Sequence, residues 1–495
     1  MIEDFTSPTS GSPLKGATQP PNLSQVGVAL FDRAEVLGEP DPMTPIDAAQ
    51  RLSASAIRTS VFAVTPVYGG QGGSSSKQTS GWACGLGGSP FRFQKPSDLS
   101  RNMLWVTNLE ETHIARMGRD RHPHFRAQDF LGTHLDLLRL EWGLTQPFCD
   151  MPQITQGVAS YLGRILSASV SEGVPWSLIL SAPSLGAAFK DAIIGRDAST
   201  SAYVDEGLQR AYQARVVVRP ESLSALKDTS RHLWRLRRPR WMHARQMLMS
   251  PVPKSVGDSW SFLSGGEVLG ATQADRIRFL AALDAPYLAK IEIKKFHALP
   301  LNDMERLLRS AFEAAPSMSA TQGLSSSRKS SPEQPPLRAW VTQPELLYLS
   351  QLAVIDVAGL FVAERYGPIA ANGKDLMPTN RGPLSNLGVT SGLVASNIWQ
   401  GLAAPSPGGS RGSWLVTPRA CWISAADRYV CLTAAMILSS VGFEVVSYGH
   451  GAVDVSIEPH DLARLSENAF RAGLMMPAIL SGERLETSFF RPMAA

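Results

Sequence analysis

The residues with the clearest chemical potential lie in one short segment, 231–245, which reads RHLWRLRRPRWMHAR. The segment contains six arginines and two tryptophans, with no acidic residue among them. Guanidinium groups pair with phosphates, and indole faces stack on bases. We therefore predict that the segment contacts RNA or another polyanion through these residues: Arg231, Trp234, Arg235, Arg237, Arg238, Arg240, Trp241 and Arg245.

The same segment has a second interpretation. Leu233 and Leu236 are spaced as in a partly buried helix, whose tryptophans would anchor a basic face to the protein. In that case the arginines would contact a subunit, the core or solvent.

A catalytic or metal-binding set is harder to find. Four histidines lie between Met103 and Cys149, close to several carboxylates, and His122-Pro-His124 could present two imidazoles from one loop. The spacing completes no zinc motif, however, and arginines that would repel a cation lie in the same region: Arg116, Arg119, Arg121 and Arg126. The glycine-rich loops lack the Lys-Ser/Thr of a phosphate-binding loop. We predict no catalytic residue, no metal site and no cofactor.

The C-terminal part of the chain contains a helix, a tight hairpin and a second helix. The hairpin turn is Tyr448-Gly449-His450-Gly451, in which the glycines supply positive φ angles. The strand after it alternates apolar residues with Asp454 and Ser456.

This segment, about the last 50 residues, resembles the palm of RNA-dependent RNA polymerases around their Gly-Asp-Asp hairpin. In that family the turn aspartates hold magnesium for nucleotidyl transfer. Here His450 and Gly451 occupy the matching positions, and they cannot replace two hard oxygen ligands. The resemblance therefore implies a palm that has lost its metal aspartates.

Two upstream segments could extend the resemblance. Asp356, in LAVIDVAGLF, could match the family's other metal aspartate, and Ser391-Gly392 could match its nucleotide-selecting Ser-Gly. The family places that aspartate on a strand. Here Thr342-Gln-Pro-Glu345 forms a capping box, which predicts a helix over 343–366 instead.

Composition limits the protein class. The chain has 495 residues, of which 44% are hydrophobic and 18% charged, so it should fold into two to four domains. The net charge of +4 permits nucleic-acid contact without requiring it. The four cysteines form no CxxC pair, which suits a reducing compartment. The longest apolar stretch, 347–363, is interrupted by Gln351 and Asp356, so we expect no membrane partner.

Ser, Pro and Gly mark the expected domain boundaries. We predict a flexible N-terminal arm over 1–24, a main α+β domain over 25–314, a flexible linker or loop over 315–336, and a C-terminal α+β domain over 337–495. The expected fold class is α+β, a helix-rich, large body with a C-terminal helix–hairpin–helix unit. Further helices are predicted to begin at Asn302 and Ser424 and to cover 130–142, and strands are predicted over 214–218 and 290–296.

These features lead to two functional hypotheses. The first is a non-enzymatic, self-assembling structural protein of viral capsid (coat) type that forms homo-oligomers around RNA. A mobile arm, many tryptophans and no visible catalytic set favour it. The alternative is a degenerate polymerase-palm protein that acts as a nucleic-acid-binding subunit. In either case we expect an intracellular location, in the cytoplasm or a virion.

Overall fold

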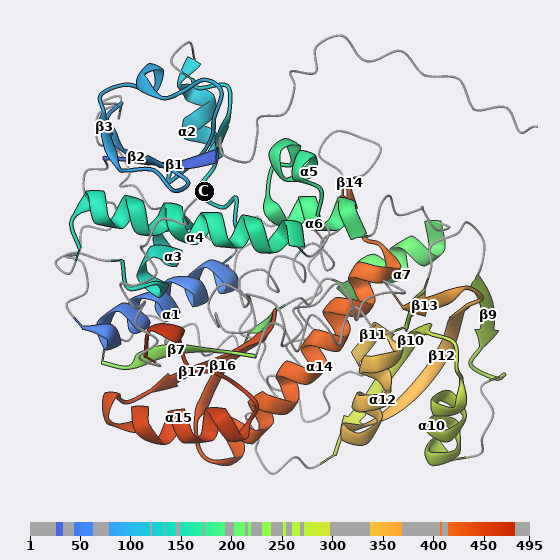
Figure 1. The fold of residues 1–495 in the computed structure, drawn as a ribbon. Helices are drawn as coiled ribbons and strands as arrows, with labels where there is room; N and C mark the ends of the chain where they lie inside the picture. Colours follow the sequence, from blue (N-terminus) through green and yellow to red (C-terminus); the bar gives the residue numbers. More distant parts are fainter. Residues whose placement is uncertain are drawn as a thin grey trace, which may run out of the picture.

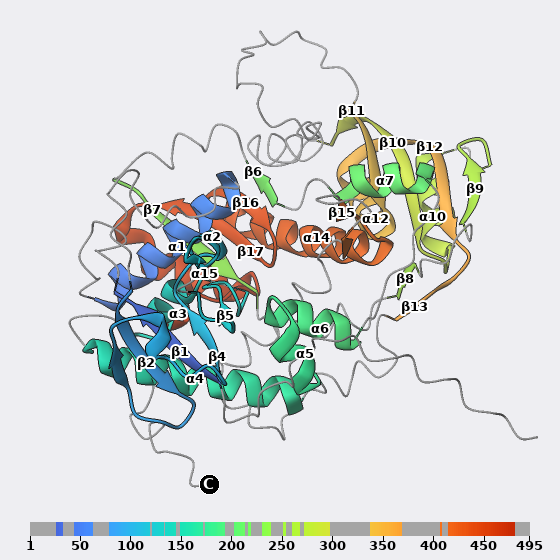
Figure 2. The ribbon, with the colours of Figure 1, turned by 90° about the horizontal axis from the view of Figure 1, so that it is seen from above.

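The fold is that of a computed structural model. It describes residues 26–32, 44–62, 79–118, 121–132, 134–144, 149–171, 174–193, 202–212, 216–218, 230–238, 251–253, 260–267, 272–297, 337–368, 406–407 and 414–480. Figures 1 and 2 show three main groups of strands with helices packed between and around them. The predicted α+β class, rich in helix, is confirmed. The predicted arm over 1–24, the linker over 315–336 and the helix from Asn302 lie outside the described residues.

The first group is a five-stranded sheet near the N-terminus, in the order β3-β2-β1-β4-β5. β1 pairs antiparallel with β2 and parallel with β4, and β5 continues in parallel beside β4. β1 is buried along its whole length, as expected for a central strand covered on both faces. The strand bounds are β1 Val26–Phe31, β2 Gly81–Gly85, β3 Phe91–Phe93, β4 Leu104–Thr107 and β5 Phe125–Arg126.

A close contact inside this sheet requires a glycine. A Cβ at Gly27 would lie 2.5 Å from the Trp105 ring, and Trp105 is one of the largest fully buried side chains.

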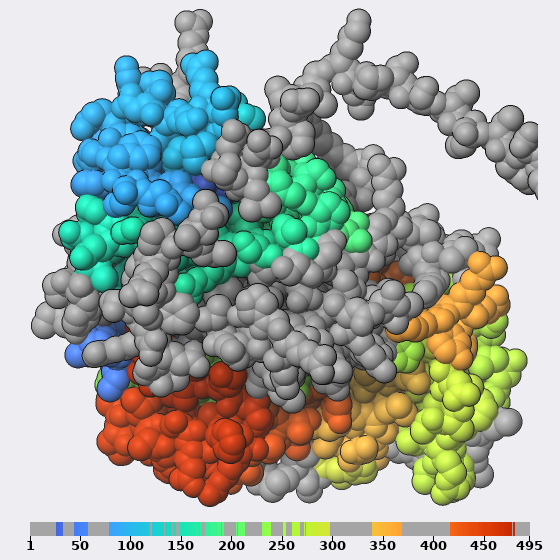
Figure 3. Space-filling view, viewed as in Figure 1, coloured from blue at the N-terminus to red at the C-terminus, as the bar shows by residue number. Residues whose placement is uncertain are grey.

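The helix α4 (Met151–Ser171) packs against β1 and β2, and Figure 3 shows the strands and α4 forming one end of the surface.

The other helices of the first half of the chain lie near different sheets: α1 packs on β7 of the third group, and α7 packs on β11 of the second group and on α14. The helix predicted over 130–142 is shorter in the structure, where only α3 forms in this range. The bounds are α1 Pro45–Phe62, η1 Pro96–Asp98, α2 Glu111–Arg116, α3 Leu135–Glu141, α5 Trp176–Ser181, α6 Leu185–Ile193 and α7 Ala202–Tyr212.

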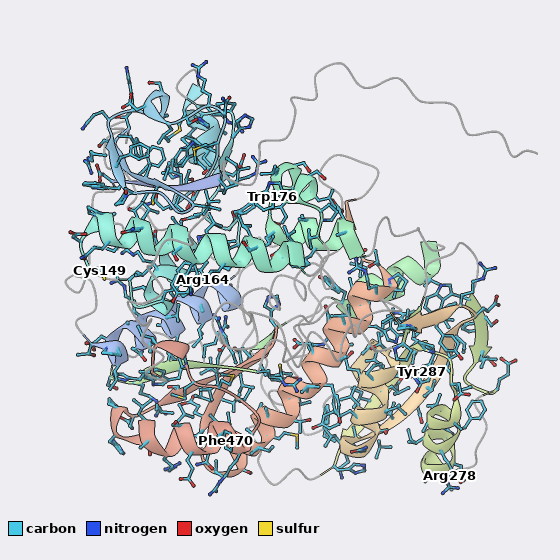
Figure 4. All side chains as sticks on the ribbon, viewed as in Figure 1. Cys149, Arg164, Trp176, Arg278, Tyr287 and Phe470 are labelled. Carbon is cyan, nitrogen blue, oxygen red and sulfur yellow. The ribbon has the colours of Figure 1, made fainter. Side chains whose placement is uncertain are left out.

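The second group is an antiparallel sheet in the order β11-β10-β12-β9. Tyr287, at the start of β10, is fully buried, and burial raises its pKa (Figure 4). The bounds are β9 Trp260–Ser264, α10 Gln273–Ala282, β10 Tyr287–Phe296, β11 Leu337–Thr342, α12 Gln343–Leu352 and β12 Ala353–Ala363. Two small antiparallel pairs are separate from this sheet: β8 Pro251–Pro253 with β13 Tyr366–Pro368, and β14 Ser406–Pro407 with β15 Trp414–Leu415.

The predicted helix over 343–366 is wrong beyond its first part. Helix α12 ends at Leu352, and the next eleven residues form β12. The β12 sequence, AVIDVAGLFVA, is rich in β-branched and aromatic residues that suit a strand. The capping box also fails, because the Thr342 side chain makes no cap hydrogen bond and Glu345 binds Arg428 instead.

The third group is the C-terminal unit, in which the predicted hairpin and the helix after it are confirmed. The helix predicted to begin at Ser424 starts earlier, at Pro418, where the Thr417 side chain caps it, and Ser424 is buried inside it. The hairpin strands β16 and β17 lie inside an antiparallel sheet in the order β6-β16-β17-β7. The last helix, α15, ends just before Gly473, whose φ of +69° is the predicted left-handed cap. The bounds are β6 Val216–Val218, β7 His232–Arg237, α14 Pro418–Ser440, β16 Glu444–Gly449, β17 Ala452–Ile457, η3 Pro459–Asp461, α15 Leu462–Arg471 and η4 Ala478–Leu480.

Helix α14 connects the second and third groups. It contacts β16 and β17 at one end and α7, α12 and β11 toward the other, so one hydrophobic core includes residues of both sheets (Figure 1). Among the described helices, α14 alone is long and apolar enough to cross a membrane. Because 67% of its most apolar window is buried in the protein, it has the character of a core helix.

The predicted domain limits can be compared with the strand pairing. β10 pairs with β11 and β12, and β6 and β7 pair with the hairpin strands. Both sheets therefore combine strands from 25–314 with strands from 337–495. The two ranges are joined by hydrogen-bonded strands and a common core.

We expect the four thiols to differ in reactivity. Cys84, Cys421 and Cys431 are buried, and burial raises their pKa, for Cys84 to about 11. Burial and Asp150 raise the pKa of Cys149 too, but this thiol is only half-buried. A disulfide reagent at pH 8 should therefore modify Cys149 in the folded chain and the other three thiols only after unfolding. Replacing Cys149 with serine should remove the early reaction. Rapid modification of two or more thiols in the folded protein would contradict this expectation.

Candidate nucleic-acid interface at the C-terminal hairpin

The hairpin turn is fixed to helix α14. Gly449, His450 and Gly451 all have positive φ angles, of 118°, 56° and 70°. The Gly451 N–H donates to both carboxylate oxygens of Asp427, at 2.9 and 3.0 Å. Asp427 is buried on α14, so this carboxylate has the structural task of holding the turn.

Asp454, the carboxylate nearest the turn on β17, is bound to an arginine of the neighbouring strand. Arg235 on β7 lies directly opposite Asp454 in the strand register. Its Nε and Nη2 donate to the two carboxylate oxygens, each at 2.8 Å, and the Ser447 hydroxyl also donates to Asp454. The Asp454 side chain is 2% exposed and that of Arg235 is 12% exposed. Both oxygens are thus occupied in a buried, two-bond ion pair.

The strands beside the hairpin supply no second carboxylate. β6 consists of three valines, and β7 reads HLWRLR. Within the described ranges, no group of three or more His, Cys, Asp or Glu side chains could hold a metal ion. A palm that binds magnesium needs converging hard oxygen ligands. Here the carboxylates near the turn bind a backbone amide and a guanidinium instead.

Asp356 does lie on a strand, as the polymerase resemblance required, but in a different sheet from the hairpin. Its carboxylate is half exposed and pairs with Lys294 at 3.2 Å and Arg276 at 3.7 Å. It is therefore part of a surface ion-pair group on the second sheet. Ser391 and Gly392 lie outside the described residues.

The predicted arginine–tryptophan segment begins as a strand, and the helical interpretation of Leu233 and Leu236 is wrong. Trp234 is fully buried in the core, where its ring cannot stack on a base. Arg231 donates to the Ser456 hydroxyl and carbonyl and lies near Glu444 and Glu458. Arg231, Trp234 and Arg235 therefore hold β7 against the hairpin.

The remaining part of the segment leaves β7 beside the hairpin turn. The backbone N–H of Arg238 donates to the Gly451 carbonyl at 2.9 Å, and Arg237 exchanges backbone hydrogen bonds with Met475. Both arginines are half-buried. Arg240, Trp241 and Arg245 lie outside the described residues. The described part of the segment therefore ends at Arg238, which is hydrogen-bonded to the hairpin turn.

The histidine-rich region does not bring its histidines together around a cation. His113 lies 3.7 Å from Glu110 on α2. His122 accepts a hydrogen bond from the His124 N–H at its Nδ1, so its Nε2 carries the proton and donates to the Ser100 carbonyl at 2.9 Å. Both nitrogens of His122 therefore stabilise the loop.

Sequence reasoning missed a buried ion pair that joins the second sheet to α14. Arg428 on α14 donates to both oxygens of Glu345 on α12, at 2.8 and 2.9 Å, and to the Ala211 carbonyl at 3.1 Å. Burial alone would lower the pKa of Arg428, but Glu345 outweighs that effect and the pKa is raised. The pair is structural and lies near the hairpin, because Arg428 follows Asp427, which holds the turn, and Tyr448 also acts on the pKa of Arg428.

No protein-family model and no curated protein matches the chain. Among solved structures, the chain is similar to Phi29 DNA polymerase complexed with primer-template DNA, at 10% identity and a TM-score of 0.42, covering 76% of each chain. The ternary complex of the same polymerase, with incoming nucleotides, gives the same identity and TM-score and covers 87% of this chain and 80% of the other. At this identity and TM-score, the likeness assigns no activity to the chain.

The capsid hypothesis is wrong. The solved structures named above are DNA polymerase chains and are neither coat proteins nor shell proteins. The self-assembly and the structural role that accompanied the capsid hypothesis have no support in these findings.

Proposed function

We propose that this chain is a nucleic-acid-binding protein built around a palm-like hairpin sheet that has no metal aspartates, and that it binds a strand without extending it. The proposal is the degenerate-palm hypothesis from the sequence. Its main support is that His450 and Gly451 fill the turn, while the nearest carboxylates, Asp454 and Asp427, are bound to Arg235 and to the Gly451 N–H.

The hydrogen bond from Arg238 to Gly451 supports nucleic-acid contact at the same place. It places Arg238, the first arginine of the basic stretch 238–245, beside the turn in which the polymerase family holds its metal aspartates. Arginines there favour phosphates, since guanidinium groups pair with phosphate oxygens in a forked geometry. The tryptophan that could stack on a base is Trp241, because Trp234 is buried.

The test is the salt dependence of strand binding. Replacing Arg238, Arg240 and Arg245 with glutamine should weaken binding of single-stranded RNA and DNA to a similar degree whatever their sequence. If each arginine contacts one phosphate, the slope of log affinity against log salt should fall by about two units, because each contact contributes about 0.7 on single strands.

A matched control removes the same charge elsewhere. Arg210, Arg278 and Arg471 lie on exposed surfaces of α7, α10 and α15, and Arg278 is 80% exposed (Figure 4). Replacing these three with glutamine should leave the slope nearly unchanged. Equal slopes for the wild type and the Arg238/Arg240/Arg245 variant, with the fold intact, would contradict the proposed interface.

A further inference from the structure

A small basic pocket opens on the N-terminal sheet, away from the C-terminal hairpin. Its cavity volume is about 250 Å³, and it is lined by Lys95, Pro96, Ser97, Arg101, Arg121, His122 and Pro123. These residues come from the two loops that precede β4 and β5. Because β4 and β5 are parallel, both loops lie at the same edge of the sheet.

The frame of the pocket is rigid. The Ser100 carbonyl accepts hydrogen bonds from His122 Nε2 at 2.9 Å and from Trp105 Nε1 at 3.1 Å. The backbone N–H of Trp105 donates to the His124 carbonyl at 3.0 Å, which joins the loop before β5 to strand β4. Pro96, His122 and Trp105 are buried, so the pocket is built on fixed groups.

The lining is positively charged. Lys95, Arg101 and Arg121 all have exposed side chains, and the lining includes no carboxylate. Asp98 is near in sequence, and its Oδ2 accepts hydrogen bonds from the backbone N–H groups of Gln94 and Lys95, which lower its pKa together with the charge of the Lys95 side chain. Burial lowers the pKa of His122, so the positive charge comes from the other three side chains.

We propose that this pocket binds the terminal phosphate of a nucleic-acid strand. This inference deepens the proposed function and rests on it for the identity of the ligand. The residues that bind phosphate are Arg101, Arg121 and Lys95, and His122 positions the loops.

Size and charge favour a terminal phosphate over an internal one. Ligand pockets commonly have volumes of about 300–1,000 Å³, so this cavity suits one phosphate group better than a whole nucleotide. An internal phosphodiester has one negative charge, whereas a terminal phosphate has about 1.5 to 2 at neutral pH. Three cations around one small cavity match the larger charge.

The experiment compares single-stranded oligonucleotides of one sequence that carry a 5′-phosphate, a 3′-phosphate or only hydroxyl ends. Binding is measured by fluorescence anisotropy with the full chain. The wild type should bind either the 5′-phosphate or the 3′-phosphate strand about tenfold or more tightly than the strand with hydroxyl ends, as expected for charge-assisted hydrogen bonds. The Arg101→Gln/Arg121→Gln variant should lose this preference and retain the affinity for the hydroxyl strand.

The control is Arg116→Gln, which removes an exposed charge from α2 of the same unit, outside the pocket lining. It should keep the preference for the phosphorylated strand, and thermal unfolding should confirm that all variants are folded. Equal affinity of the wild type for phosphorylated and hydroxyl strands would overturn the pocket assignment. A preference that survives in Arg101→Gln/Arg121→Gln would overturn it too.

A second measurement separates this inference from the proposed function. Calorimetry with inorganic phosphate as the probe should detect binding to the wild type and none to Arg101→Gln/Arg121→Gln. If the wild type binds no oligonucleotide but binds phosphate in this way, the pocket is supported as a phosphate site and the proposed function fails. If the wild type binds hydroxyl strands but no phosphate, the proposed function stands and the pocket assignment fails.

Discussion

Replacing Asp454 with alanine is expected to lower the free energy of unfolding by about 3–5 kcal/mol. The substitution leaves Arg235 without its carboxylate in a position where its side chain is only 12% exposed. An uncompensated buried charge is costly, because little water can reach it. Urea denaturation followed by tryptophan fluorescence measures the change, and Trp234 on β7 is one of the eleven tryptophans that contribute to the signal.

A matched control is Asp356→Ala, which removes a carboxylate that is 51% exposed and paired at the surface. This change should cost about 1 kcal/mol or less. The double variant Asp454→Leu/Arg235→Met removes both charges of the buried pair and should recover most of the lost stability. Near wild-type stability of Asp454→Ala would contradict a structural role for the pair.

Replacing Glu345 with alanine is expected to have a similarly large effect, about 3–5 kcal/mol. Arg428 is 4% exposed and donates two hydrogen bonds to Glu345, so its charge would lose the group that compensates it. Since α14 is shared between two sheets, the loss should destabilise both in one cooperative transition. Thermal unfolding followed by circular dichroism measures the loss.

The control for Glu345→Ala is Glu467→Ala on α15. Glu467 and its partner Arg471 are both 64% exposed, and pairs of this kind contribute about 0.3–0.5 kcal/mol. Comparable losses of unfolding free energy in the two variants would show that the Glu345–Arg428 pair stabilises the fold no more than an exposed ion pair does.

The elements predicted best from the sequence are those with strong local signals. The hairpin has glycines at the turn and alternating residues in β17, and α15 ends at a glycine, so local patterns fix both elements. The region after Leu352 was predicted wrongly, because a capping pattern at Thr342 says where a helix begins and not where it ends. The β-branched residues of β12 were the signal that could have found the strand.

The interface was predicted only in part, for a physical reason. Arginines in a sequence show that charge is present, but their partners depend on strand pairing across more than 200 residues. Arg235 and Asp454 meet because β7 and β17 are adjacent in the sheet. Both residues lie between apolar neighbours in the sequence, in LWRLR and AVDVS, where an unpaired charge would be costly. This pattern was the signal that could have predicted their pairing.

The most direct test of the central claim is a primer-extension assay in which strand binding is measured in the same sample. The purified chain is given a labelled primer–template, the four nucleotides and magnesium. We predict that the strand binds and that the primer stays at its original length, because Asp454 is held by Arg235 and Asp427 by the hairpin turn. Template-directed extension that is lost in the Asp454→Asn variant would contradict the claim and would identify Asp454 as a metal ligand.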